Sequence, residues 1–344
     1  MILLDDFQCR ERLFPFTHIR HASDIRVGIF TIREKWERLT SGSVGDFTGT
    51  KPEGAVVIPA DIIPEKNNFQ QILAACIQSR EPEAKDILRL NHPWQIFEFN
   101  ARCLKADFAL LSSSADFTAG EDNKLINTEE IIIESGADVS HSIINATDGP
   151  VYIAAGAKVM EGSMIRGPFA MLENSVVKMG ARIYGATTLG PSCIAGGEIK
   201  NSVFFGYSNK AHDGYLGDSV IGEWCNIGAG SSNSNIRNNA SAATYILNQG
   251  ASPIRAGLKA GLLMGDFSRC AINTSFYTAS VTGICCNIFG PSIPPKYSGH
   301  FTWGASIYEW EKACVDMENW MRLKGRSLSS ELTQKLLSLY QTVR

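Results

Sequence analysis

The sequence lacks paired cysteine motifs, long apolar runs and a large net charge. Its nine cysteines are odd in number and show no Cys-x-x-Cys spacing, which argues against a disulfide framework and a zinc site. No stretch approaches the ~18 apolar residues of a membrane span, and the N-terminus shows no signal-peptide pattern. A net charge of −3 gives no electrostatic reason to bind nucleic acid or an anionic membrane. We therefore expect a cytoplasmic protein whose cysteines are reduced core residues.

Glycine and a six-residue repeat dominate what is present. The 31 glycines are about 9% of 344 residues, against ~7% in average proteins, as a turn-dense β fold requires. Apolar residues recur at every sixth position, at Ile153, Val159, Ile165, Met171, Val177, Ile183 and Leu189. Because 44% of all residues are apolar, the probability that all seven positions of one fixed register are apolar by chance is about 0.003.

A period of six fits neither an α-helix at 3.6 nor a single strand at 2. It is typical of short strands joined by regular corners, as in a β-helix. Small residues stand two positions before five of the seven apolar ones, where we expect tight packing, at Ala157, Ser163, Ser175, Ala181 and Thr187. The spacing begins at Ile133 and returns at Tyr215, Ile221 and Ile227, and again from Met264 to Ile288. The intervening stretches, 202–214 and 231–253, are expected to be loops, and the first is a candidate functional loop.

Residues 1–108 predict a separate, small α/β domain. Buried strands are expected at Ile2–Leu4 and Ala55–Pro59, helices at 24–39 and 69–78, a loop at 42–54 and a helical linker at 83–107. Residues 24–36 resemble the N-terminal segment of bacterial sugar nucleotidyltransferases that carry a hexapeptide-repeat tail, although this domain is shorter.

Asp61 follows the second buried strand, where an acidic residue can hold Mg²⁺ on a nucleoside triphosphate. The alternative is an ordinary turn residue at a strand end. The glycine-rich phosphate loop of sugar-phosphate nucleotidyltransferases is missing, because the first glycine is Gly28. Without its backbone amides, the phosphates have no cradle.

The strongest motif lies in the second half of the repeats. It reads His212-Asp213-Gly214-Tyr215-Leu216-Gly217-Asp218, then Ile221-Gly222, Asn226-Ile227-Gly228-Ala229-Gly230 and Asn235. This motif resembles the acetyltransferase domain of the bifunctional glucosamine-1-phosphate acetyltransferase/N-acetylglucosamine-1-phosphate uridyltransferase family. The resemblance implies a left-handed parallel β-helix over residues 109–303. It also implies a homotrimer with active sites between protomers.

The same resemblance implies roles for individual residues. His212 is the catalytic residue, Lys200, Tyr215 and Asn226 bind the sugar substrate, and Ala229 and Asn235 contact acetyl-CoA. The chain departs from the family where Ile236 replaces a tyrosine, and where Met171 and Glu173 stand in place of substrate-binding arginines; Arg182 is a candidate substitute. These departures concern the acceptor more than acyl transfer itself.

Acyl transfer also follows from the chemistry of the residues. Attack on a thioester needs a base, and a histidine side chain titrates near neutral pH. Glycine-rich turns such as Gly228-Ala229-Gly230 expose backbone N–H groups that can stabilise an oxyanion.

Residues 304–344 show helical spacing. Helices are expected at Ser306–Leu323 and after an N-cap within Ser327–Ser330. We expect them to cap the open end of the β-helix; a share in the CoA site is the alternative.

The fold class expected from these observations is mainly β: a left-handed parallel β-helix with a small N-terminal α/β domain and C-terminal helices. Two functions stay open. One is acyl, most simply acetyl, transfer from acyl-CoA to a sugar phosphate or nucleotide amino sugar. The other is Mg²⁺-dependent sugar-1-phosphate nucleotidyl transfer (uridylyl or thymidylyl), with the β-helix as an oligomerisation or regulatory module. The missing phosphate-loop glycines favour the first.

Overall fold

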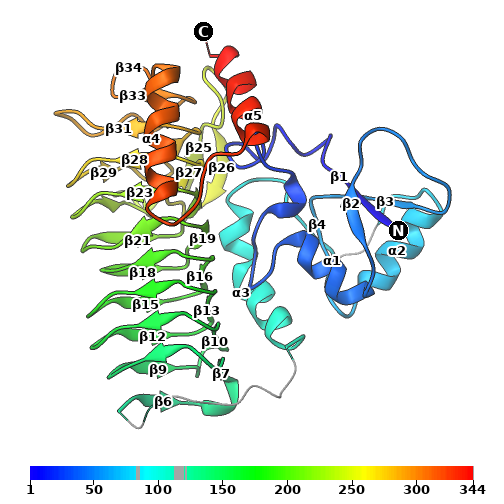
Figure 1. Ribbon diagram of the computed structural model, residues 1–344, viewed down its shortest axis with the longest axis horizontal. Coiled ribbons are helices and arrows are strands. Elements are labelled where there is room, and N and C mark those ends of the chain that lie inside the picture. Colours follow the sequence, from blue (N-terminus) through cyan, green and yellow to red (C-terminus); the bar gives the residue numbers. More distant parts are fainter. Residues whose placement is uncertain (83–85, 112–119, 121, 344) are drawn as a thin grey trace.

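The computed structural model describes residues 1–82, 86–111, 120 and 122–343. A small α/β part is followed by a tall parallel β-solenoid, and two C-terminal helices lie beside the upper coils (Figure 1). The predicted mainly β fold with a parallel β-helix is therefore confirmed. No helix among the described residues has the length and apolar character needed to cross a membrane.

The N-terminal part is built on a three-stranded parallel sheet in the order β2-β1-β3. Its strands and the neighbouring hairpin are β1 (Ile2–Asp5), β2 (Val44–Asp46), β3 (Val56–Pro59), β4 (Ile62–Ile63) and β5 (Leu88–Arg89). Strands β1 and β3 were expected, whereas β2 lies inside the predicted loop. Strand β2 is only three residues long and shows no alternation of apolar and polar residues. It forms by pairing with β1, where Val44 lies opposite Ile2.

The helices of this part are shorter than the sequence suggested. They are η1 (Ala22–Asp24), α1 (Ile32–Thr40), α2 (Phe69–Ile77) and α3 (Gln95–Phe108). The predicted helix over 24–39 is wrong for residues 25–31, because Gly28 has φ +83° and Thr31 caps α1 through a capping box with Glu34. The linker over 83–107 is helical only in α3, and residues 83–85 lie outside the described range.

Three parallel sheets form the walls of the solenoid. The first, called here the covered sheet, has the order β32-β30-β27-β22-β19-β16-β13-β10-β7. Its strands are β7 (Ile131–Ile133), β10 (Val151–Ile153), β13 (Phe169–Met171), β16 (Thr187–Leu189), β19 (Val203–Gly206), β22 (Val220–Glu223), β27 (Leu263–Met264), β30 (Val281–Thr282) and β32 (Tyr297–Ser298).

The second, the helix-side sheet, comprises β8 (Asp138–Val139), β11 (Lys158–Val159), β14 (Val176–Val177), β17 (Ile194–Ala195), β20 (Asn209–Lys210), β23 (Asn226–Ile227), β28 (Arg269–Cys270), β31 (Asn287–Ile288), β33 (Thr302–Trp303) and β34 (Ser306–Ile307). The third, the open sheet, comprises β6 (Lys124–Ile126), β9 (Ile143–Asn145), β12 (Met164–Arg166), β15 (Arg182–Tyr184), β18 (Glu198–Lys200) and β21 (Tyr215–Gly217). The remaining elements are η2 (Thr128–Glu130), the pair β24 (Ser232–Asn233) and β29 (Ser275–Phe276), and the antiparallel hairpin β25 (Ala243–Tyr245) and β26 (Ile254–Gly257).

The six-residue register is confirmed by burial. All seven apolar residues from Ile153 to Leu189 are at most 2% exposed and belong to one core inside the coils. The small residues two positions earlier are equally buried. Each coil therefore buries one apolar side chain per wall, and stacking of coils makes a continuous core.

The loop expected at 202–214 is wrong in large part. The chain forms β19 and β20 there, and both strands are buried. The six-residue register shifts there because only Gly196 and Gly197 join β17 to β18, whereas residues 178–181 join the equivalent strands β14 and β15. In the next coil Leu216, at 2% exposure, fills the interior in place of the predicted Tyr215.

Two of the three sheets are partly covered from outside. The N-terminal part and α3 pack on the covered sheet, where Phe16 stacks edge-on against Phe205 at 5.1 Å between ring centroids. Arg20 ties this contact to the upper coils through ion pairs with Asp266 (3.0 Å) and Glu223 (3.2 Å). The open sheet keeps Ile143 and Met164, outward residues of β9 and β12, more than 40% exposed.

The C-terminal helices are α4 (Trp310–Arg322) and α5 (Ser330–Gln341), the second capped by the Ser329 hydroxyl. Residues 306–307, expected to be helical, pair instead as β34 with β33. The helices pack laterally against a column of corner residues from successive coils: Trp224, Phe267, Cys285 and Phe301. Their observed contacts therefore run along the side of the upper coils (Figure 1).

Candidate functional site

His212 lies in the corner between β20 and β21. The side chain is exposed, and its imidazole makes no hydrogen bond to any described residue. Gly214, with φ +118°, completes the turn because a Cβ there would lie 2.1 Å from the Ser231 carbonyl oxygen. The sequence thus presents an unpartnered imidazole at the surface of a rigid coil.

Ala229 occupies the same corner one coil further along. The Gly230 N–H donates to the Asp213 carbonyl at 3.0 Å, which joins the two corners directly. The predicted catalytic residue and one predicted CoA contact are therefore stacked in adjacent coils.

Tyr215 and Asn235 meet in a polar network at the far end of the open sheet. The Asn235 amide donates to the Tyr215 hydroxyl oxygen at 2.9 Å and to an Asp218 carboxylate oxygen at 2.5 Å. The Asn201 amide donates to the other Asp218 oxygen at 2.7 Å. Burial, followed by the negative charge of Asp218, raises the pKa of Tyr215 well above its usual range. The Tyr215 hydroxyl therefore stays protonated and keeps its O–H as a hydrogen-bond donor.

Lys200 lies on β18, the neighbour of β21 in the open sheet. Its ammonium sits 5.7 Å from the centre of the Tyr184 ring, a cation–π contact. Arg182, the candidate substitute arginine, lies on the adjacent β15 and faces Glu198 at 3.9 Å. Positive side chains thus line the sheet that also carries Tyr215.

Asn226 lies on β23, in the helix-side sheet. Its Oδ1 accepts a long hydrogen bond of 3.4 Å from the Asn209 amide, whose own Oδ1 accepts from Lys324 at 3.0 Å. The predicted residues therefore occupy two walls, and the corner that carries His212 is where those walls meet.

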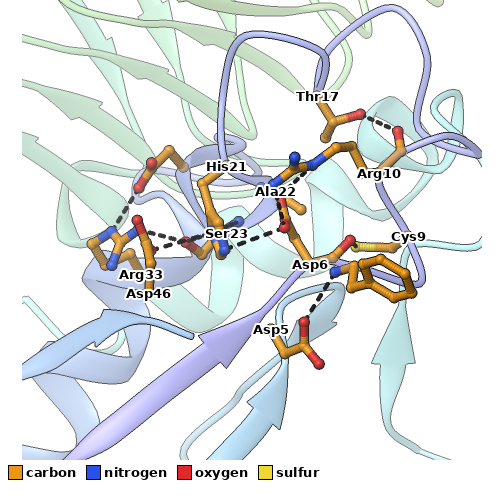
Figure 2. Close-up of polar contacts among 12 residues, drawn as sticks. Asp5, Asp6, Cys9, Arg10, Thr17, His21, Ala22, Ser23, Arg33 and Asp46 are labelled. Carbon is orange, nitrogen blue, oxygen red and sulfur yellow. Dashed lines mark hydrogen bonds and ion pairs between the residues drawn. The ribbon is translucent and has the colours of Figure 1, made fainter. Parts of the chain in front are cut away.

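Acidic residues also gather at the carboxyl edge of the N-terminal parallel sheet, where a nucleotidyltransferase would hold its metal and triphosphate. Asp6 accepts from Arg10 at 2.8 Å and lies 3.6 Å from His21, and Asp46 accepts from Arg33 at 2.5 Å (Figure 2).

Asp61 is 2% exposed and pairs with Arg12 and, at 3.6 Å, with Arg89. Burial raises the pKa of Asp61 despite both arginines. Asp6, Asp46 and Asp61 thus each already have a cationic partner, whereas Asp5 accepts from the Phe7 N–H at 3.0 Å. No cluster of three candidate ligands in the described part of the chain could hold a metal ion. These residues do not fit a magnesium site, which favours a structural role for Asp61.

Gly28, the first glycine, serves packing. Its N–H donates to Asn100 at 2.7 Å, and its carbonyl accepts from the Thr188 hydroxyl of β16 at 3.0 Å. This glycine therefore fastens the N-terminal part to α3 and the solenoid and leaves no amides for phosphates.

Sequence reasoning missed two site residues. Asp218 links Asn201 and Asn235, and its place within the matched motif was the available signal. Lys210 falls within the stretch 202–214 that was expected to be a loop, whereas it lies inside the coil at 2% exposure.

Comparison with known proteins agrees with both halves of this architecture. A family described as "Sugar nucleotidyl transferase" matches residues 1–75. The "Bifunctional protein GlmU" of Methanococcus maripaludis strain C5 is 29% identical over 187 residues, 54% of this chain and 39% of that protein. Its namesake from Rippkaea orientalis is 30% identical over 132 residues, 32% of this chain and 29% of that protein.

These alignments span less than two-fifths of the length of the two relatives. Over part of its length the chain is accordingly similar to the bifunctional GlmU proteins, with an N-terminal segment that matches the sugar nucleotidyl transferase family and a β-solenoid built on six-residue repeats.

Proposed function

We propose that the protein transfers an acyl group, most simply acetyl, from acyl-CoA to a sugar phosphate or nucleotide amino sugar. The observation that carries this proposal is the exposed, unpartnered His212 imidazole, one coil from Ala229. It lies at the edge of a wall that also bears Lys200 and Tyr215. Similarity to the GlmU proteins supports a sugar-related substrate.

In this mechanism His212 removes a proton from the attacking amine or hydroxyl as that group adds to the thioester carbonyl. The carbon–sulfur bond then breaks, and the leaving thiolate takes that proton back from His212. Lys200 supplies positive charge for a phosphate, and Tyr215 and Asn226 supply hydrogen bonds that orient the sugar. Ala229 and Asn235 lie along the CoA. A positioned base of this kind contributes about 10²–10⁴-fold in rate.

We propose further that the protein acts as a homotrimer with sites between protomers. The open sheet supports this, because its outward Ile143 and Met164 are exposed on the same wall that carries Tyr215. Light scattering on the full chain at micromolar concentration should report three times 37.5 kDa; a monomer contradicts the proposal.

A cytoplasmic location is proposed from the free cysteines, since none of the nine forms a disulfide among the described residues.

Nucleotidyl transfer at the N-terminal sheet is the second candidate, supported by the family match over residues 1–75. The arginine partners of Asp6 and Asp61 make it the weaker one.

The test measures thiol release from acetyl-CoA against a panel of amino-sugar phosphates and nucleotide amino sugars. His212→Ala should lower kcat by about 10²–10⁴-fold and leave the affinity for acetyl-CoA unchanged, because the imidazole meets the acceptor. Asn235→Ala should chiefly weaken acetyl-CoA binding. His141→Ala is the matched control, since His141 is another exposed corner histidine of the solenoid. Full turnover by His212→Ala on an accepted substrate would show that the histidine is structural.

A further inference from the structure

Lys210 is a charged residue in the apolar interior of the solenoid. Strand pairing places it in one inward column with Val139, Val159, Val177, Ala195, Ile227, Cys270 and Ile288. The side chain is 2% exposed. Ala195, at the same place in the preceding coil, leaves room for the longer chain. Nothing in packing alone requires an ammonium at this position.

The ammonium is held by backbone carbonyls beneath the His212 corner. Lys210 Nζ donates to the carbonyl oxygen of His212 at 2.5 Å and to that of Gly196 at 3.1 Å. A buried charge is tolerated only when such partners replace water. Lys210 therefore joins two successive coils at the corner that carries the imidazole.

The two ends of His212 therefore differ in surroundings: its carbonyl is held by the buried ammonium, and its imidazole is exposed. We infer that Lys210 is a positioning residue that holds the His212 turn in the geometry required for acyl transfer. This inference rests on the proposed function.

The charged and titratable groups that face Lys210 are Asp213 on the same turn and Cys270 on β28. Burial lowers the pKa of the Lys210 ammonium to about 8, and the charge of Asp213 opposes that shift. Above this pH the ammonium loses one N–H donor, so its hold on the turn weakens.

Lys210→Met is the decisive variant, because methionine has a similar length, is apolar and leaves no unpaired charge in the core. We expect the variant to stay folded, with kcat lower by about 10²-fold and KM for acetyl-CoA within about twofold. The wild-type kcat should fall above about pH 8, and the variant should not show this decrease at alkaline pH. Cys286→Ala is the matched control: it removes another interior side chain that donates to a backbone carbonyl, that of Gly299 at 2.9 Å, away from the His212 corner.

Two readouts separate this inference from the proposed function. A crystal structure of Lys210→Met should show residues 211–214 displaced; an unchanged turn overturns the inference whether or not an acceptor is known. If His212→Ala loses turnover while Lys210→Met keeps the wild-type kcat and pH profile, Lys210 is structural and the proposed function stands. Full turnover by His212→Ala refutes both.

Discussion

Acid should weaken the docking of the N-terminal part through two histidines that lie 282 residues apart. The Ile284 N–H donates to His300 Nδ1 at 2.9 Å, so the ring proton is on His300 Nε2, which donates to His18 Nδ1 at 2.8 Å. His18 Nε2 then faces a Glu11 carboxylate oxygen at 3.4 Å. A second proton on His300 would go to Nδ1 and face the Ile284 N–H, and a proton on His18 Nδ1 would face the His300 Nε2–H. Either proton would set donor against donor.

The expected loss follows from the pKa of His300. Burial, followed by the neighbouring His18, lowers this pKa to about 3, against ~6.5 for a solvated imidazole. Between these values the unfolded chain binds a proton that the folded chain does not. The stabilisation is therefore complete above pH 6.5 and lost as the pH falls. From pH 7 to pH 5 the free energy of unfolding should drop by about 2 kcal/mol from this group alone.

Urea unfolding of the full chain at pH 7 and pH 5 measures this loss. In His300→Gln, whose amide can accept from Ile284 and donate to His18, the acid-induced loss should be smaller by about 2 kcal/mol. His141→Gln, a change at an exposed corner histidine, should behave as the wild type. Equal losses in the wild type and His300→Gln would refute the reasoning.

Two further predictions concern the N-terminal part. Gly28→Ala should lower the free energy of unfolding by about 2 kcal/mol or more, because its Cβ would lie 2.3 Å from an Asp107 oxygen and 2.9 Å from the Cys103 backbone. Gly54→Ala controls for backbone strain alone, since Gly54 also has positive φ but open space around it, and urea unfolding compares the two. We also expect no pyrophosphate release from nucleoside triphosphates with hexose-1-phosphates. Arginines pair with the carboxylates of Asp6, Asp46 and Asp61, and His21 lies beside Asp6. Release that Asp61→Asn abolishes would contradict this.

The sequence predicts the regular coils well and the irregular ones poorly. From Ile153 to Leu189 successive inward residues are always six positions apart, so a fixed period finds each buried residue. The short corner at Gly196-Gly197 breaks that period. In β20 the inward position holds Lys210 and not an apolar residue, so the apolar repeat cannot be recognised there. A buried lysine that donates to backbone carbonyls does not appear in the pattern of apolar residues. The residues around Lys210 were therefore predicted to be a loop.

The site was predictable only as far as the motif extends. The residues from His212 to Asn235 were identified by resemblance, but their distribution over two walls depends on where each corner turns. At the N-terminal edge, the pairing of Asp61 with Arg12 joins residues 49 positions apart, and no local pattern announces it. The same holds for β2, which forms only because β1 offers it a partner.

The ion pair between Arg20 and Asp266 has a consequence for synthesis of the chain. The two residues are 246 positions apart, so at about 5–20 residues per second a ribosome needs roughly ten to fifty seconds to deliver the second after the first. Until then, Leu13, Phe14 and Phe16 lack the coils that bury them in the native core. The first segment made is among the last to reach its final neighbours, and truncation before the upper coils should leave an aggregation-prone product.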